Sequence, residues 1–426
     1  MSFTKKFLSS SILSVVDQGM LSALNFAIGA MLIRFVSKDV YGLYGQLYAG
    51  GLLAGLLVDS WIAGPLTTVA SAVHEHARRV LLRRYWYRQI FWTLAMGGLA
   101  LLVVALLPPV THGHGQAWSL GLAFALYVIG NGLREYGRTV GFIQSDIHSV
   151  LRQDSVYVAA VILGGVVLLS RQQVDLYSVF LLLAGASLLC AWFGRARLLE
   201  RTAADASNIA AADLLVIDSH QSTIRGHGRW AVLGVTVGWL SNYSYVYLSG
   251  AWLGLAAIAD LNASRLLLMP IPLAVAAWSR VARPEASRLM AEHNWSALKK
   301  LTLFSVVGIE FVVLSYVGVL LLTLPWLEAH VIGSKYSGLD PLIMLWGAYF
   351  AVNAVRWIGT SWLMSGGAFR SMFLLGTITL GLVVALTSYT IPHWGPAGAV
   401  FALIAVELFE TVVVWKFIYP RLQLPQ

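Results

Sequence analysis

Charged residues are scarce in this chain. Only 12% of its 426 residues are Asp, Glu, Lys or Arg, whereas 58% are hydrophobic. Soluble domains carry about a quarter charged residues, so this composition excludes an ordinary soluble domain. The sequence therefore predicts an all-α integral membrane protein that crosses the bilayer many times.

Signals for metal binding and catalysis are also missing. The single cysteine, Cys190, lies in an apolar run, which excludes a disulfide framework and a thiolate metal site. The paired histidines of HEH (74–76) and THGHGQ (111–116) have no further ligands at suitable spacing, so no metal site is predicted. There is no phosphate-binding Gly-Lys-Ser/Thr loop and no nucleophile elbow, so we expect neither an enzyme nor a bound cofactor.

Long apolar segments run through the whole sequence. We predict about twelve transmembrane helices, at 11–33, 41–70, 89–109, 117–138, 154–170, 176–194, 230–249, 256–281, 301–324, 339–364, 368–390 and 396–418. The polar stretch 195–229 separates two halves of six spans, 1–194 and 230–426, and we interpret it as a cytoplasmic connector. Two six-helix bundles around a central cavity are the usual plan of alternating-access transporters.

Basic residues are distributed unevenly among the predicted loops. Most Lys and Arg fall in the loops on the side of the N-terminus, and the opposite loops hold four: Arg34, Lys38, Arg171 and Lys335. This positive-inside bias predicts that both termini are cytoplasmic. The net charge of +9 is then a topology signal, and we expect no nucleic-acid partner.

The first half carries polar side chains within its predicted spans. Gln18 and Asn25 share one face of the first span, and Asp17 lies about a quarter of a turn away. Asp59 lies deep in the second span. Small residues on the same face would suit a helix–helix contact, whereas Gln, Asn and Asp favour a water-filled cavity. We predict that Gln18 and Asn25 face the path of a hydrated headgroup and that Asp17 borders it.

Both deep arginines lie in the second half. Tyr349, Asn353 and Arg356 share one face of span 339–364, and Arg265 shares a face of span 256–281 with Asn262. Arginine suits phosphate, because its guanidinium presents a fork of hydrogen-bond donors. In the alternative interpretation, the arginines pair with nearby carboxylates and only hold the bundle together.

The candidate substrate-binding residues are polar or aromatic side chains on these faces: Arg356, Arg265, Asn353, Tyr349, Gln18, Asn25, Asn262, Asn242 and Tyr245. The candidates for coupling transport to a proton or sodium gradient are the deep carboxylates: Asp17, Asp59, Glu310 and Asp260. In the structural alternative, Asp260 and Glu310 are the partners of the two arginines.

Three stretches carry a family resemblance. SVVDQGMLSALNFAIGAMLIRFVSKDVYGLYG (14–45) resembles the first span and outer turn of Wzx-type polysaccharide flippases, which belong to the multidrug/oligosaccharidyl-lipid/polysaccharide (MOP) exporter superfamily. LGLAAIADLNASRLLLMPIPL with the following ARPEASRL (253–289) and GPAGAVFALIAVEL (395–408) are similar to the same family.

The resemblance implies a MOP/MATE-like fold and translocation of an undecaprenyl-diphosphate-linked oligosaccharide across the bacterial inner membrane. A cationic central cavity would hold the anionic headgroup, with Arg265 and Arg356 in that role. The expected partners are this lipid-linked oligosaccharide, membrane lipids, a polysaccharide polymerase and a chain-length regulator. Two alternatives stay open: an ion-coupled multidrug exporter of the same fold, and a membrane polysaccharide polymerase or ligase. The latter would need a large outer loop, and all predicted outer loops are short.

Overall fold

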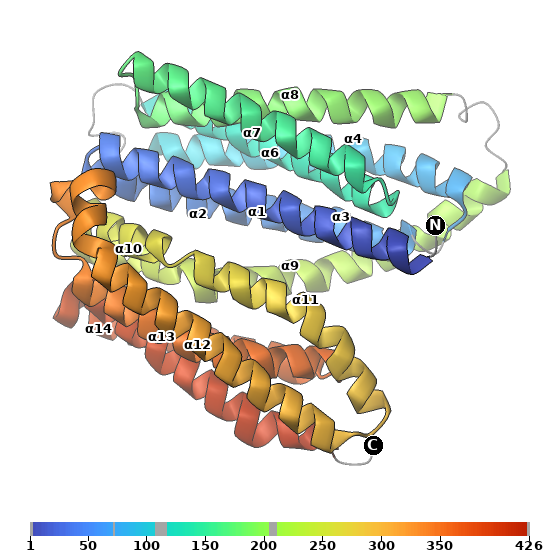
Figure 1. Cartoon of the computed structure of the whole chain (residues 1–426). Helices are drawn as coiled ribbons and strands as arrows, with labels where there is room; N and C mark the ends of the chain where they lie inside the picture. The colour runs from blue at the N-terminus through green and yellow to red at the C-terminus, as the bar shows by residue number, and fades with distance from the viewer. Residues whose placement is uncertain (1–2, 71–72, 107–116, 204–210, 424–426) are drawn as a thin grey trace. The chain divides into compact units, whose positions relative to one another are not determined.

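The protein is all-helical in the part that its computed structural model describes, residues 3–70, 73–106, 117–203 and 211–423 (Figure 1). The histidine motif at 111–116 lies outside these residues. The first helices are α1 (Phe3–Phe35), α2 (Lys38–Trp61), α3 (Ala63–Ala70), α4 (Glu75–Leu106), α6 (Ala117–Ile143), α7 (Ile147–Ser170) and α8 (Leu176–Ala203). The remaining long helices are α9 (Ala211–Leu253), α10 (Leu255–Leu267), α11 (Pro270–Ala291), α12 (Trp295–Leu327), α13 (Asp340–Ser365) and α14 (Phe369–Val412).

Four short elements complete the described chain. They are η2 (Glu328–Ile332) and η3 (Ser334–Tyr336), between α12 and α13, and η4 (Val413–Ile418) and η5 (Tyr419–Gln423), after α14.

Eight of the described helical segments are long and apolar enough to cross a membrane, and a ninth is added if α10 and α11 form one span bent by 47°. Pro270 begins α11 at this bend, where its missing N–H breaks the helical hydrogen-bond pattern. Gly395 divides α14 in the same way, because its φ of 60° and ψ of −145° are not helical. With this division, and with α6 and α9, each predicted span overlaps one described helix or two consecutive ones, and residues 107–109 at the end of one span lie outside the described part of the chain. The prediction of an all-α membrane fold is confirmed.

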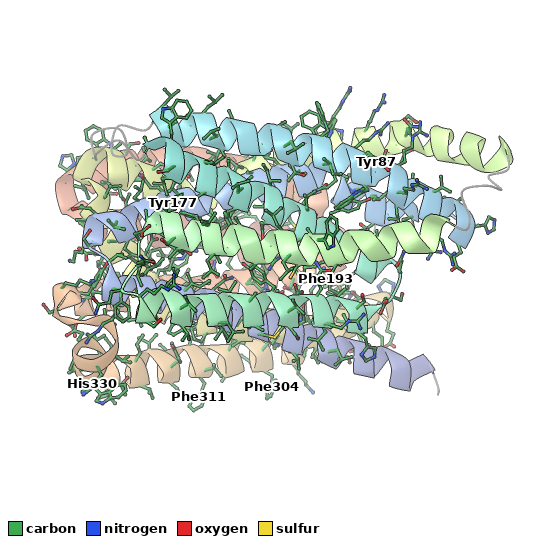
Figure 2. All side chains as sticks on the ribbon, turned by 90° about the horizontal axis from the view of Figure 1, so that it is seen from above. Tyr87, Tyr177, Phe193, Phe304, Phe311 and His330 are labelled. Atoms are coloured by element: carbon green, nitrogen blue, oxygen red, sulfur yellow. The ribbon has the colours of Figure 1, made fainter. Side chains whose placement is uncertain are left out.

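Large hydrophobic side chains are exposed on several of these helices. Phe193 on α8 and Phe304 and Phe311 on α12 point away from the ribbon (Figure 2), with 52%, 78% and 72% of their surface exposed. Such helix faces suit contact with lipid.

The chain forms two compact units. Unit 1 comprises Met1–Asn25 and Leu47–Thr236, and unit 2 comprises Phe26–Gln46 and Val237–Gln426. The tip of the α1–α2 hairpin thus belongs to unit 2, and the first part of α9 belongs to unit 1. The division into two six-span halves with a connector at 195–229 stays a prediction.

Unit 1 is built around α6, which packs against α4 and α8. A buried cluster joins α2, α3, α4, α6 and α9 through side chains such as Leu66, Leu81 and Ile224. The Tyr136 hydroxyl, also buried there, donates to the Leu82 carbonyl at 2.7 Å, so the cluster satisfies this polar atom internally.

Unit 2 is built around α13, which packs against α10, α11, α12 and α14. Trp346 and Trp362 of α13 are completely buried. The Trp362 indole N–H donates to the Thr302 hydroxyl of α12 at 3.0 Å, which fixes the orientation of the ring.

The hairpin tip, Phe26–Gln46, is held to the rest of unit 2 by charge and by close packing. Lys38 Nζ lies 2.7 Å from Asp260 Oδ1 of α10. Lys335 donates to the carbonyl oxygens of Arg34 (3.1 Å) and Val36, where α1 ends and its carbonyls lack helical partners. Gly42 contacts the α10 backbone so closely that a Cβ would lie 1.9 Å from the Leu255 carbonyl oxygen.

Gly42→Ala is therefore expected to destabilise the protein. The new methyl group forces α2 away from α10, at a cost of about 1–3 kcal/mol typical of overpacking. Thermal unfolding of the purified protein measures the effect. Gly19→Ala in α1, where a Cβ would meet nothing within 4 Å, is the matched control and should not lower the melting temperature. Equal melting temperatures for the two variants would contradict this packing.

Candidate functional site

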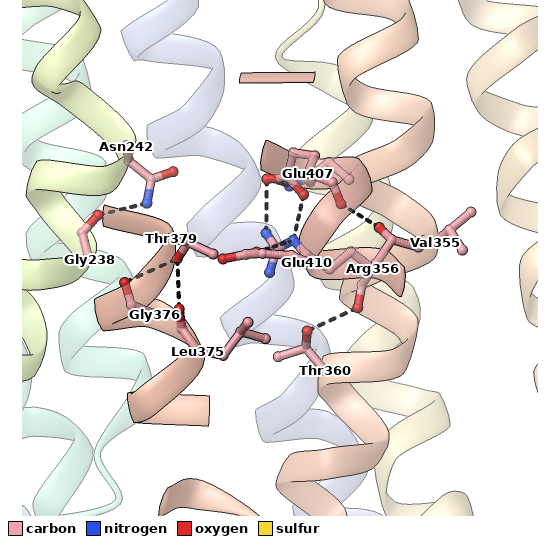
Figure 3. Close-up of polar contacts among 12 residues, drawn as sticks. Gly238, Asn242, Val355, Arg356, Thr360, Leu375, Gly376, Thr379, Glu407 and Glu410 are labelled. Carbon is pink, nitrogen blue, oxygen red and sulfur yellow. Dashed lines mark hydrogen bonds and ion pairs between the residues drawn. The ribbon is translucent and has the colours of Figure 1, made fainter. Parts of the chain in front are cut away.

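Arg356 is the centre of a buried ionic cluster in unit 2. Its Nε donates to Glu407 Oε2 at 2.5 Å, and its Nη2 donates to Glu407 Oε1 at 3.2 Å (Figure 3). Asn353 Nδ2 and the Tyr349 hydroxyl, from the same face of α13, donate to Glu407 Oε1 at 3.0 and 3.3 Å. Glu407 thus accepts four hydrogen bonds from three side chains of α13.

A second carboxylate shares the same guanidinium. Glu410 Oε2 lies 2.9 Å from Arg356 Nε, the nitrogen that already donates to Glu407. Glu407 and Glu410 are three residues apart in α14, so they project from one side of the helix. With two carboxylates and one guanidinium, the cluster carries one surplus negative charge when all three groups are ionised.

Arg265 has a different environment. Its Nη1 donates to the Tyr245 hydroxyl at 2.8 Å, and its guanidinium lies 5.3 Å from the Trp346 ring centroid and 5.8 Å from that of Tyr243. No described carboxylate forms an ion pair with it, and its buried Nε has no hydrogen-bond partner in the same residues. Aromatic faces stabilise this cation without neutralising it.

The two arginine environments are neighbours in unit 2. Trp346, which contacts Arg265, packs edge-on against Tyr349 with the ring centroids 5.3 Å apart, and Tyr349 donates to the partner of Arg356. The helical spacing that places 346, 349, 353 and 356 on one face of α13 therefore joins both arginines through a single stripe.

The other predicted residues of unit 2 have separate surroundings. Asp260 pairs with Lys38, and Asn262 lies against Gly45, where an added Cβ would be 2.0 Å from its Nδ2. Asn242 is exposed and donates to the Gly238 carbonyl of its own helix at 2.8 Å. Glu310 is half-buried, and its buried Oε1 has no hydrogen-bond partner among the described residues.

Asp260 and Glu310, which the structural alternative named as partners of the arginines, form no ion pair with either arginine in the described residues. Asp260 is five residues before Arg265, which places it on another side of α10, toward the hairpin tip. Arg356 instead forms ion pairs with the two glutamates of α14, which were not among the predicted site residues. Glu407 and Glu410 lie three residues apart within an apolar segment, and this pattern could have indicated a paired carboxylate site from the sequence.

Unit 1 contains an ionic cluster of its own. Arg138 of α6 donates from Nε to Asp154 Oδ2 (2.6 Å), from Nη1 to Glu135 Oε2 (2.7 Å) and from Nη2 to Asp17 Oδ2 (3.0 Å). Arg134 donates to Glu135 Oε1 at 2.6 Å and stacks 3.8 Å from the Tyr157 ring centroid. Three carboxylates against two guanidinium groups again leave one surplus negative charge.

Asp17 and Asp154 share one edge of the Arg138 guanidinium. The Nε and Nη2 hydrogens of an arginine point in parallel and normally receive both oxygens of a single carboxylate. Here each hydrogen is bound by a different carboxylate, so the two acceptor oxygens are held next to each other. The remaining Oδ1 atoms of both aspartates are buried without a partner in the described residues. Such a pair can hold a shared proton.

The remaining predicted residues of unit 1 are exposed. Gln18, Asn25 and Asp59 lie on the surface of the unit, whereas Asp17 is only 1% exposed. Asp17 thus faces the interior of unit 1, with Arg138. Arg134 and Arg138 were expected only as basic residues at the cytoplasmic end of the predicted span 117–138, and neither Glu135 nor Asp154 was predicted as a site residue. The charged motif REYGR (134–138) could have indicated this ionic cluster from the sequence.

No protein-family model and no curated protein sequence matches this chain. Its fold, however, is shared by solved membrane transporters. An inward-facing multidrug resistance MATE family transporter of the MOP superfamily matches with a TM-score of 0.74 and 11% identity, over 94% of both chains. The lipid II flippase MurJ in an inward closed conformation matches with a TM-score of 0.71 and 14% identity, over 96% of this chain and 86% of that one.

A third solved structure is a MOP superfamily transporter from Pyrococcus furiosus, described as having a binding pocket of reverse polarity. It matches with a TM-score of 0.63 and 12% identity, over 98% of this chain and 95% of that one. These identities establish the fold alone. The chain is a multi-pass membrane protein with the fold of MOP superfamily transporters, and the proteins compared here are transporters and a flippase rather than enzymes.

Arg356→Met is expected to destabilise the protein, because it leaves Glu407 and Glu410 buried together without a counter-ion. The loss should be about 3–5 kcal/mol, the usual cost of breaking a buried ion pair from one side. Removing all three charges, with Arg356→Met, Glu407→Gln and Glu410→Gln, should restore most of the stability. Thermal unfolding in detergent measures both variants, and an unaffected Arg356→Met protein would show that the cluster contributes little.

Proposed function

We propose that this protein is a flippase for an undecaprenyl-diphosphate-linked oligosaccharide repeat unit. It would move the unit from the cytoplasmic to the periplasmic leaflet of the bacterial inner membrane by alternating access, for surface polysaccharide or exopolysaccharide synthesis. Both termini would be cytoplasmic, and a polysaccharide polymerase with a chain-length regulator would act on the product. The single observation that carries the proposal is Arg265, a cation held by aromatic rings without a carboxylate.

An anionic substrate would complete the environment of Arg265. A buried cation without a counter-ion is costly, and a phosphate oxygen could accept from its unpartnered Nε. Arg356 is a weaker candidate for this contact, because Glu407 and Glu410 already neutralise it. We therefore assign the diphosphate to Arg265 and treat Arg356, with Asn353 and Tyr349, as the support of the neighbouring stripe.

The exposed polar face of unit 1 supports a hydrated path. The side chains of Gln18 and Asn25 on α1 and of Asp59 on α2 are exposed on the surface of unit 1. Polar side chains facing lipid are expensive, so this face suits contact with water and a sugar headgroup. The lipid tail of the substrate would stay in the bilayer.

A multidrug exporter of the same fold is the second candidate. It is favoured by the surplus negative charge of the Arg138 and Arg356 clusters, since carboxylates suit cationic drugs. Arg265 argues against it, because an unneutralised guanidinium repels a cationic substrate.

Arg265→Gln is expected to abolish export and to leave the protein folded, since the remaining partners of this residue are neutral. The measured quantity is the amount of lipid-linked repeat unit in the lipid extract of a deletion strain complemented with each variant. Accumulation of the lipid-linked repeat unit should be relieved by wild type and by Arg280→Gln, an exposed control on α11, but not by Arg265→Gln. Arg265→Lys should restore part of the activity through its charge.

If the deletion strain keeps its surface polysaccharide and accumulates no lipid-linked unit, this result would contradict the flippase proposal and favour the drug exporter. Full activity of Arg265→Gln in a strain that does accumulate the unit would remove only the assigned contact.

We further propose that a proton gradient drives transport through Asp17 and Asp154. One proton shared by this pair would make the cluster of Asp17, Glu135, Asp154, Arg134 and Arg138 neutral, and its release would restore the surplus charge. Of the carboxylates predicted for coupling, Asp17 is the one with a carboxylate partner on a shared guanidinium. Asp260, by contrast, has Lys38 as its counter-ion.

Asp154→Asn is expected to uncouple transport from the gradient. In proteoliposomes, substrate uptake driven by an imposed pH difference should fall to the level without a gradient, while exchange of substrate between the two sides continues. Glu75→Gln, at an exposed carboxylate of the same unit, is the control and should keep gradient-driven uptake. Gradient-driven uptake that survives in Asp154→Asn would exclude the pair as the coupling site.

A further inference from the structure

Unit 1 contains a cationic pocket that the proposed transport mechanism does not use. It lies where α9 packs on the α2–α3 junction and on α4, and it has a volume of about 240 Å³. Its lining residues combine arginines with aromatic side chains: Trp61, Ile62, Tyr85, Arg88, Trp92, Ile224 and Arg225. Such a combination suits an anionic group with an apolar neighbour.

The two arginines of the pocket have no described counter-ion. The guanidinium of Arg88 lies 4.8 Å from the Tyr85 ring centroid, and its Nη2 donates to the neutral Gln221 Oε1 at 3.2 Å. Arg225 is exposed, and no described carboxylate forms an ion pair with either residue. Both charges are therefore available to a ligand.

Tyr85 supplies a buried polar group at the same place. Its side chain is 2% exposed and forms part of the pocket lining, and its hydroxyl lies beside the Arg88 guanidinium without a regular hydrogen bond to any described residue. Leaving a buried hydroxyl unpaired is costly, so it indicates a missing partner. Two guanidinium forks and one hydroxyl donor match the oxygens of a phosphate group.

The length of α2 suits a position of the pocket near the depth of lipid headgroups. Trp61 is the last residue of α2, a helix of 24 residues that is long enough to cross the hydrocarbon core from Lys38. Trp61 and Trp92 pack edge-on with their ring centroids 6.1 Å apart, as tryptophans at a membrane interface commonly do. Phe91, which precedes Trp92 in sequence and packs against it, is 64% exposed and offers an apolar surface for acyl chains.

We propose that this pocket binds the phosphate of an anionic phospholipid headgroup from the leaflet on the side of Trp61. The positive-inside bias makes that leaflet the cytoplasmic one. Arg88 and Arg225 hold the phosphate oxygens, the Tyr85 hydroxyl donates to one of them, and the two tryptophans pack against the glycerol and the first carbons of the chains. The lipid joins α9 to α2 and α4, independently of the substrate that is transported.

The test uses the purified full-length protein in neutral detergent, with phosphatidylglycerol and phosphatidylcholine of equal chain length as probes. Native mass spectrometry reports the lipid retained by each variant. Wild type should retain phosphatidylglycerol in preference to phosphatidylcholine. The double variant Arg88→Gln/Arg225→Gln should bind phosphatidylglycerol about 25-fold more weakly, at roughly fivefold for each basic side chain. Tyr85→Phe should weaken retention without changing the melting temperature.

Arg280→Gln, a basic position on α11 outside the pocket, should retain phosphatidylglycerol like wild type. Undiminished retention in the double variant, or an equal loss in Arg280→Gln, would overturn the proposal. Displacement of phosphatidylglycerol by inorganic phosphate at equal concentration would assign the pocket to free phosphate. If farnesyl diphosphate displaces bound phosphatidylglycerol at a lower concentration than added phosphatidylcholine does, and below the concentration of phosphatidylglycerol itself, the pocket would be assigned to an isoprenoid diphosphate. If the double variant does not fold, the exposed Arg225→Gln alone should show the fivefold loss.

Discussion

A guanidinium group buried in a membrane protein must be neutralised or stabilised by its surroundings, and this requirement organises both units. Arg138 joins α1, α6 and α7 through three carboxylates, and Arg356 joins α13 to the last part of α14 through two. In both clusters the carboxylates exceed the guanidinium groups by one. The same contacts that hold the helices together therefore leave a charge that a proton can balance.

Arg265 meets the requirement in another way. Aromatic rings and a tyrosine hydroxyl stabilise its charge but leave it positive, next to a cluster that is negative. In the proposed mechanism, Arg356 is neutralised by carboxylates and Arg265 binds the substrate, and a single stripe of α13 connects the two arginines. A site of this kind can accept an anion without first losing an internal ion pair, so substrate binding need not compete with the packing of the bundle.

Hydropathy and helical periodicity predicted much of this structure. The length of the apolar segments placed each span on a helix, and the spacing of Tyr349, Asn353 and Arg356 placed them on one face. The partners of the arginines could not be predicted, because they depend on which helices are neighbours. Arg138 was expected at the cytoplasmic end of span 117–138, because charged residues end a hydropathic segment, whereas α6 itself continues to Ile143. Asp17 was expected at the border of a cavity, because it lies a quarter of a turn from Gln18. Its ion pair with Arg138 depends on α6, which the periodicity of α1 does not specify.

The division of the α1–α2 hairpin has a consequence for the order of assembly during synthesis. Residues 26–46 belong to unit 2, yet they are made long before the helices they pack against. Until α10 has been inserted, Lys38 lacks the counter-ion Asp260, and Gly42 lacks the backbone against which α2 packs. The first hairpin can enter the membrane alone, but its tip reaches its final place only late in translation. A fragment that begins in α9 would lack part of its own unit, so the C-terminal half cannot mature without the beginning of the chain.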